Sequence, residues 1–480
     1  MAMARSVYAR GALGEPIPTG ARLIKRTCIR PGWTRYNLRG ADPVWEGTPP
    51  ARRIAPREDD SGAPQRSTFS MAFQITYIPT NSSHMGKTLP VLRALREAGA
   101  DLRILCLDEL QVAPHHLLPQ IQSTDFGYSC LLRGTYSPRR HWFPCAVQRR
   151  SIERCFDSFL GSDRSSLFLL ADDTWVPMRL FARVLARRGI PSVLIADGIE
   201  PRFKPSYHLP ARDKVSSAAR RILYGWGPRG TSGVQRILAM TKTCGNVFRG
   251  HGIATEKIVV VGSPEFDRIA ACRAGLDDAV AASAIRARLA LDPDRPIVFY
   301  AHQGITGSDL IESVVWNLAA ACGRIGASLL VKFHPRADED PGPWRLLARR
   351  RGFDPGTVSF FKTECTSIEA LLVCATCVTA FSTVALEAMI HRRPVVVLQY
   401  LPVRETLTLA RDYGAALDVD DSGGLAEAIR STVADPGMRA RIVANAQEAL
   451  RQEMYGLDGK SIHRTVEAIL DLGTRTGSGR

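Results

Sequence analysis

The chain has 480 residues, of which 45% are hydrophobic, and it carries a formal net charge of +16 at neutral pH. This length exceeds one ordinary hydrophobic core, so we expect about two well-packed domains and not a chain that is disordered throughout. No apolar run approaches the roughly 18 residues that span a bilayer, and the amino-terminal residues lack the apolar centre of a signal peptide, which favours a cytoplasmic protein.

The positive charge is dispersed and rich in arginine. It comes without a zinc finger, an aromatic-interleaved stretch or an arginine-rich block, so we expect no nucleic acid partner. Anionic small molecules, anionic polymers or an anionic membrane surface explain the charge equally well.

The eleven cysteines are scattered and odd in number, which argues against a disulfide framework and for reduced thiols. Cys374 and Cys377 have the spacing of a redox motif, but no second pair and no following histidine accompany them. We therefore expect two packed small residues and no metal site.

Residues 1–70 form a different kind of sequence, dominated by Pro, Gly, Arg and Ser and without apolar periodicity. They predict a disordered basic extension or a mis-assigned start. Met71 then opens a well-formed strand, and the functional protein is expected to begin near it.

The first structured stretch predicts a strand, a polar loop, a helix and a second strand over residues 73–108. The loop TNSSHMGKT holds His84 and Gly86, and the helix is expected to begin after it, near Leu89. His84 is either a functional side chain or an ordinary loop or capping histidine.

Two further strands end in carboxylates. Asp172 and Asp173 follow the strand at 166–170 and are interpreted as a solvated turn or as a cap for the next helix. Asp197 and Gly198 follow the strand at 191–196. Asp197 is the preferred candidate for a catalytic carboxylate, and the alternative is a turn in which Asp bonds its own backbone.

A basic, partly amphipathic stretch follows at 211–249, which we interpret as a solvated arginine-rich helical face or as a contact with the inner membrane leaflet. The strand at 256–261 then leads into Gly262, whose lack of a side chain would let the backbone approach a ligand, and Asp267 is expected to fix the turn.

The second half repeats the layout of the first. A strand at 296–300 is followed by His302, Gln303 and Gly304, and then by a helix that ends near Gly326. A strand at 329–333 stops at Pro335, which has no N–H for the ladder, and leaves three cationic side chains at its end: Lys332, His334 and Arg336.

The strand at 377–381 leads into Ser382 and Thr383, which could cap a helix beginning near Val384. Hydroxyls, free N–H groups and the positive helix end would converge there with the cationic side chains. The carboxyl ends of parallel strands are where open α/β sheets bind ligands, so this stretch predicts an anion site for a nucleotide diphosphate or a similar group.

These residues carry a family resemblance. The HPR after a strand, the STVALEA helix, the following Pro-hydrophobic strand and the string EKIVVVGSPEFDRI resemble GT-B glycosyltransferase-fold enzymes. The likeness is strongest to CDP-glycerol glycerophosphotransferases and capsule polysaccharide transferases of bacteria, and more distant to UDP-N-acetylglucosamine 2-epimerase. One departure is Arg392-Arg393, which stands where relatives have Gly before the final strand and puts the usual tight turn in doubt.

The resemblance implies an α/β fold of GT-B type, with two Rossmann-like domains facing a central cleft and a carboxyl-terminal helix that crosses back. The implied domains are an acceptor domain at 71–270, a nucleotide-donor domain at 271–455, and a closing helix and tail at 456–480.

It also implies a metal-independent transferase without a cofactor, which moves a sugar or polyol-phosphate from a CDP, CMP or UDP-type donor to a surface polysaccharide or lipid-linked, teichoic-acid-like acceptor. Asp197, or failing that His84, would take the acceptor proton, and His334 is a further catalytic candidate. The matching glutamate, Glu387, would reach a ribose hydroxyl unless it pairs with a neighbouring arginine. The donor would lie among Gly262, His302, Gln303, Gly304, Lys332, His334, Arg336, Ser382, Thr383 and Glu387.

Two alternatives stay open. One is a nucleotide-sugar 2-epimerase on the same fold, although Ser382-Thr383 stands where a Gly-Gly pair is expected. The other is a non-catalytic nucleic-acid-binding or scaffold protein that uses the positive charge.

Overall fold

The computed structural model describes residues 73–107, 117–131, 145–196, 198, 202–203, 227–274, 278–302, 308–334, 340–401, 405–406 and 411–477. The expected amino-terminal extension lies outside these ranges, as do four predicted site residues: Asp197, Gln303, Gly304 and Arg336.

The first half of the chain builds a seven-stranded, all-parallel sheet with the strand order β3-β2-β1-β4-β5-β7-β8. Its central strands are short runs of apolar residues, such as LFLL in β4, because both faces of a parallel sheet are covered. The strands are β1 (Gln74–Ile78), β2 (Asp101–Leu107), β3 (Gly127–Leu131), β4 (Leu167–Leu170), β5 (Ser192–Ala196), β7 (Arg236–Ala239) and β8 (Ile258–Val260).

Two separate apolar clusters cover the faces of this sheet. Phe168 and Leu170 of β4 belong to one cluster, whereas Leu167 and Leu169 belong to the other, as the alternation along a strand requires. The helices of this half are α1 (Ser82–Glu97), α2 (Leu117–Gln122), α3 (Cys145–Ser162), α4 (Val176–Arg187), α6 (Lys242–Gly250) and α7 (Pro264–Ala274), with a 3₁₀ turn at Thr255–Lys257.

Helix α1 begins earlier than the sequence predicts. The side chain of Asn81 accepts a hydrogen bond from the backbone N–H of His84 and caps the helix, so most of the expected polar loop forms its first turns. Pro90, expected at the helix start, instead lies inside it. His84 is therefore a helical residue of the first turn.

The second half builds a six-stranded, all-parallel sheet with the order β11-β10-β9-β12-β13-β15. Its strands are β9 (Ile297–Ala301), β10 (Ser328–Lys332), β11 (Val358–Phe361), β12 (Thr376–Thr379), β13 (Val395–Leu398) and β15 (Leu417–Val419). Its helices are α8 (Asp278–Arg288), α9 (Ser308–Arg324), α10 (Pro341–Arg350), α11 (Ser367–Val373), α12 (Val384–Ile390), α14 (Leu425–Ala434) and α15 (Pro436–Glu453). A two-residue strand of the first half, β6 (Arg202–Phe203), pairs antiparallel with β14 (Glu405–Thr406).

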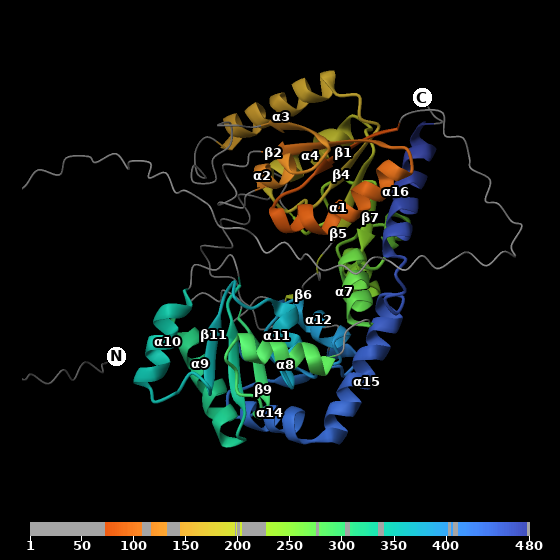
Figure 1. Ribbon diagram of the computed structural model, residues 1–480. Helices are drawn as coiled ribbons and strands as arrows, with labels where there is room; N and C mark the ends of the chain where they lie inside the picture. The colour runs from red at the N-terminus through yellow and green to blue at the C-terminus, as the bar shows by residue number, and fades with distance from the viewer. Residues whose placement is uncertain are drawn as a thin grey trace, which may run out of the picture. The chain divides into compact units, whose positions relative to one another are not determined.

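The chain ends on the first half. Helix α15 packs into the core of the second sheet through Ala446 and Leu450, whereas the next helix, α16 (Ser461–Gly477), packs beside α1 (Figure 1). The guanidinium of Arg236 in β7 donates to the carbonyl of Ala468 at 2.5 Å. The predicted α/β fold with two Rossmann-like sheets and a returning carboxyl-terminal helix is confirmed.

Both strand orders reverse once, between β1 and β4 in the first sheet and between β9 and β12 in the second. At such a reversal the connections leave on opposite faces, which opens a crevice at the carboxyl ends of the two strands. These two points are where a ligand is expected. Among the described helices, none is both long and apolar enough to cross a membrane.

Candidate functional site

A cavity of about 300 Å³ opens at the reversal point of the second sheet. It brings together four side chains that the sequence predicts for the donor site, from the ends of three strands. They are His302 after β9, Lys332 and His334 at the end of β10, and Ser382 after β12.

His302 is a buried residue in the wall of this cavity. Its backbone N–H donates to the carbonyl of Lys332 at 3.0 Å, and its ring packs edge-on against Tyr300 and Phe333. The side chain is 3% exposed, whereas that of His334 is exposed at the rim. His334 is therefore the histidine that an incoming group meets first.

Lys332 supplies charge to the cavity wall and not a free phosphate ligand. Its ammonium donates to the carbonyls of Phe333 and Lys362, at 3.3 and 3.2 Å. Burial lowers its pKa, and the charges of nearby acidic groups, including Glu387, oppose the change.

Of the two predicted capping residues, Ser382 accepts a hydrogen bond at the start of the helix and Thr383 does not. The N–H of Val384 donates to Ser382 Oγ at 3.2 Å, and the helix α12 begins at Val384 as predicted. Thr383 has a helical backbone and its side chain makes no capping bond. Ser382 is thus the hydroxyl at the start of this helix that lines the cavity.

Glu387 lies one turn further along α12, and its predicted alternative, a salt bridge to arginine, is absent among the described ion pairs. Burial raises its pKa to about 7, helped by the charge of Glu265 and opposed by those of Lys87 and Lys332. Lys87 in α1 itself pairs with Glu265 in α7 at 3.0 Å. Glu387 therefore gains or loses a proton near neutral pH.

A second group of ionisable side chains lies at the reversal point of the first sheet. His84 Nδ1 is 2.5 Å from the hydroxyl of Thr80, just after β1. Asp172, just after β4, accepts two hydrogen bonds to Oδ1 from the N–H and hydroxyl of Thr174, and it lies 3.7 Å from the guanidinium of Arg229. Burial alone would raise the pKa of Asp172, but the charges of Arg229 and His84 and the bonds from Thr174 hold it below its usual value.

Asp173 is not the solvated turn or helix cap that the sequence suggests. It is fully buried, and both carboxylate oxygens accept from the N–H of Gly230 at 2.9 Å. The buried guanidinium of Arg179 lies 3.8 Å away, and Trp175 is the cap residue of the following helix. Asp173 instead fixes the loop that carries Arg229.

Sequence reasoning named Asp172 only as a turn or a helix cap, and it did not name Arg229. The missing signal was the strand order, because only the reversal between β1 and β4 places the end of β4 beside that of β1. Local patterns around an Asp-Asp pair favour a turn, and they carry no information on neighbouring strands.

Gly262 packs closely against Ser461, and its predicted approach to a ligand stays a prediction. It has φ 85°, and a Cβ at this position would overlap Ser461 Oγ. The carboxylate of Asp267, in the first turn of α7, accepts a hydrogen bond from the N–H of Ser461 at 2.9 Å. The close approach therefore seats the start of α16, although Gly262 also lines a small cavity of about 30 Å³ beside Lys87 and Glu265.

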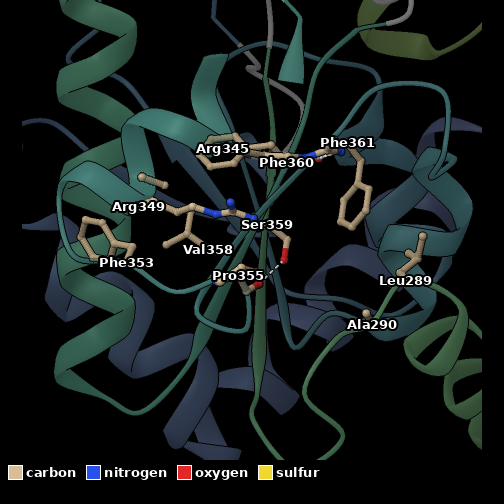
Figure 2. Close-up of a pocket in the computed structure, with 11 residues that line it drawn as sticks. Leu289, Ala290, Arg345, Arg349, Phe353, Pro355, Val358, Ser359, Phe360 and Phe361 are labelled. Carbon is tan, nitrogen blue, oxygen red and sulfur yellow. Dashed lines mark hydrogen bonds between the residues drawn. The ribbon is translucent and has the colours of Figure 1, made fainter. Parts of the chain in front are cut away.

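A further pocket, of about 180 Å³, lies at the edge strand β11 and holds none of the predicted site residues. Figure 2 shows it, with Arg345 lying along Phe360 and Phe361. Its lining is mostly apolar, and we assign it no part in the candidate site.

Cys374 and Cys377 are packed, as the sequence predicts. Both are buried, and burial raises the pKa of Cys374 to about 12 and that of Cys377 well above its usual value. Among the described residues, no group of three or more His, Cys, Asp or Glu side chains could hold a metal ion.

No protein-family model matches this chain, and no curated protein sequence matches it. Solved structures with the same fold do align with this chain. UDP-GlcNAc 2-epimerase from Neisseria meningitidis, bound to UDP-GlcNAc, aligns with a TM-score of 0.55 and 14% identity over 83% of this chain and 99% of that one. The enzyme from Methanocaldococcus jannaschii, in complex with UDP-GlcNAc and UDP, aligns with a TM-score of 0.53 and 15% identity over 83% and 99%. At these identities the likeness shows the fold, and this chain therefore has a GT-B-like fold of two parallel-sheet, Rossmann-like domains.

Proposed function

We propose that this protein is an enzyme that binds a nucleotide-activated sugar or polyol at the carboxyl end of its second sheet and breaks the bond to the leaving phosphate. The observation that carries the proposal is the cavity at the reversal point, where His302, Lys332, His334 and Ser382 meet. That the two solved structures with this fold were bound to UDP-GlcNAc supports a donor of this class.

The chemistry of the donor side follows from the charges. As the bond to the phosphate breaks, negative charge develops on its oxygens, and fixed positive groups and hydroxyls placed beforehand lower the barrier. The buried ammonium of Lys332 cannot turn away, since two carbonyls hold it. Ser382 and His334 would offer the direct hydrogen bonds.

The finer proposal is transfer of the sugar or polyol-phosphate to a hydroxyl of a polysaccharide or teichoic-acid-like acceptor, without a metal or cofactor. The acceptor's proton needs a base. His84 is a candidate at the end of the first sheet, with Asp172 stabilising the charged imidazolium that forms. Asp197, the preferred base from the sequence, stays a prediction.

Epimerisation of a nucleotide sugar at C2 is the second candidate. The two solved structures above are UDP-GlcNAc 2-epimerases, which favours this reaction. The ionisable residues at the reversal points of the two sheets would supply its acid and base. It differs from transfer in one observable respect, since it needs no acceptor.

The first test is thermal-shift binding of CMP, CDP, UDP and GDP to the full chain. One nucleotide should stabilise the protein, by about 2.7 kcal/mol at a hundred times its Kd. Ser382→Ala should weaken this response, whereas Ser359→Ala, at the unrelated pocket of β11, should leave it unchanged. If no nucleotide shifts the melting temperature, the proposal is wrong, and salt-dependent binding to DNA or RNA becomes the next measurement.

The second test separates the two chemistries. The nucleotide sugar chosen by the first test is incubated with and without a polysaccharide acceptor, and products are separated by anion-exchange chromatography. Release of nucleotide that depends on acceptor supports transfer, whereas a C2 epimer formed without acceptor supports epimerisation. In either case His334→Ala should lower turnover on the order of 10²-fold, as expected for one well-aimed phosphate contact.

A further inference from the structure

A second and larger cavity lies away from the candidate donor site. It has a volume of about 580 Å³, which is the size of pocket that holds a small organic ligand. It lies where the carboxyl end of α12 meets α7, the start of α8 and the end of α15, and its polar wall includes Arg273, Asp278, Arg392 and Gln447.

Two arginines on this wall keep hydrogen-bond donors to spare. Arg273 donates to the carbonyl of Ile390 at 3.3 Å and pairs with Asp278 at 3.1 Å, but its buried Nε has no partner among the described residues. The guanidinium of Arg392 makes no hydrogen bond or ion pair with any described residue, and its side chain is exposed. The side-chain amide N–H of Gln447 already has a partner, since it donates to the carbonyl of Met389 at 2.8 Å.

A buried histidine lies beside this wall. His391, between the lining residues Ile390 and Arg392, is 2% exposed, and neither of its ring nitrogens has a partner in the described part of the chain. Burial lowers its pKa to about 4, and the charges of Arg273 and Arg393 add to this effect while that of Asp278 opposes it. At neutral pH the ring is therefore uncharged and carries one N–H donor.

The backbone around the cavity is held in an unusual conformation. Arg392 and Leu457 line it with φ of 54° and 58°, and Tyr455 beside Gly456 has φ of 55°. Left-handed backbone is unfavourable for a residue with a Cβ, and such positions gather where surrounding structure maintains them for a function. This turn sets the direction in which the Arg392 side chain leaves the backbone.

We propose that this cavity is a second ligand site, for a small organic molecule that carries a phosphate or carboxylate group. Arg273 and Arg392 would bind its oxygens. Guanidinium groups match the geometry of both oxyanions. His391 does not line the cavity, but it stands between the lining residues Ile390 and Arg392 and so can report on binding there. The site shares no lining residue with the donor cavity.

The experiment uses the full chain with ¹⁵N-labelled histidine, and the probes are inorganic phosphate and citrate at constant ionic strength. The ring signal of His391, assigned by its loss in His391→Gln, should move on addition of at least one probe. Whichever probe acts at the lower concentration identifies the preferred oxyanion. Movement confined to His302 and His334 would place the anion in the donor cavity and overturn the proposal.

A pair of variants gives a second readout that does not depend on His391→Gln folding. Arg392→Asn removes the charge, and Asn accepts left-handed backbone better than most residues. It should raise the Kd for the probe at least about tenfold, as loss of a hydrogen bond to a charged group does. Arg475→Asn removes an exposed arginine of α16 and should leave the Kd unchanged. Equal Kd values in the wild type and both variants, or no response to either probe, would also overturn the site.

Discussion

Arg392 stands where the family pattern has a glycine, yet the backbone still forms the tight turn before the last strand of that pattern. The sequence has Arg-Arg where a glycine is expected before the last strand of the fold, which puts the tight turn in doubt. The structure makes that turn with Arg392 at φ 54°, and Arg393 then donates to the carbonyls of Leu371 and Leu372. The strain at one arginine is offset by two hydrogen bonds from the next.

The raised pKa of Glu387 predicts that the stability of the fold depends on pH. A carboxyl whose pKa is raised from 4.5 to about 7 binds its proton more tightly in the folded state, so its contribution is complete below pH 4.5 and is lost as the pH rises to about 7. The groups that act on it are Glu265, Lys87 and Lys332. One pKa unit is worth about 1.4 kcal/mol, so the loss is on the order of 3 kcal/mol.

Glu387→Gln should therefore match the wild type in urea denaturation at pH 4.5, since glutamine resembles the protonated acid, and should exceed it by up to about 3 kcal/mol at pH 8. Glu97→Gln, an exposed glutamate of α1, should show no such divergence. A difference between Glu387→Gln and the wild type that is the same at both pH values would show that Glu387 titrates normally.

Helix α16 depends on the absence of a side chain at one position. Gly473 lies against the ring of Phe73 at the entrance to β1, and an added Cβ would overlap that ring. Alanine normally stabilises a helix by about 1 kcal/mol relative to glycine. Here overpacking should reverse the sign, and Gly473→Ala should destabilise the protein by about 1–3 kcal/mol.

Two controls sharpen that prediction. Gly323→Ala in α9, where nothing lies within 4 Å of the new Cβ, should be neutral or stabilising. Gly473→Ala made in a Phe73→Leu background should lose most of its cost, because the overlapping ring is gone. Chemical denaturation of the four variants measures both, and a full cost that persists without the ring would point to a cause other than this contact.

The edge of the second sheet is closed by a side chain. Strand β11 exposes one edge, but Arg345 donates to the carbonyl of Phe360 through Nε at 3.2 Å and through Nη2 at 2.6 Å (Figure 2). The N–H of Val358 donates to the carbonyl of Asp354 at 3.1 Å. These bonds occupy one carbonyl and one N–H of the edge, which makes it a poorer template for another strand.

Arg345→Met should keep the apolar stem and lose both bonds, with a loss of stability of about 1–3 kcal/mol. It should also raise light scattering during long incubation near the melting temperature, because the edge becomes available. Arg349→Met changes a neighbouring arginine of the same pocket that makes no hydrogen bond to this edge within the described part of the chain, and it should aggregate no faster than the wild type. Similar scattering by both variants would show that Arg345 does not protect the edge.

At the scale of the whole molecule, the sequence predicts the fold well. It predicts poorly the ionisable side chains that gather at the reversal point of the first sheet. Repeated strand–helix units and apolar runs are local signals, so the two parallel sheets and the returning helix follow from them. The pairing of Lys332 with two carbonyls, the burial of Asp173 and the neighbourhood of His84 and Asp172 depend on contacts between distant segments. Hydrophobic periodicity does not encode such contacts.

Helix α12 touches both cavities, with Ser382 and Val384 lining one at its start and Ile390 and Arg392 lining the other at its end. Were binding at one cavity to shift α12, the lining of the other cavity would shift with it. Thermodynamic reciprocity would then require each ligand to alter the affinity of the other by the same factor, whichever is added first.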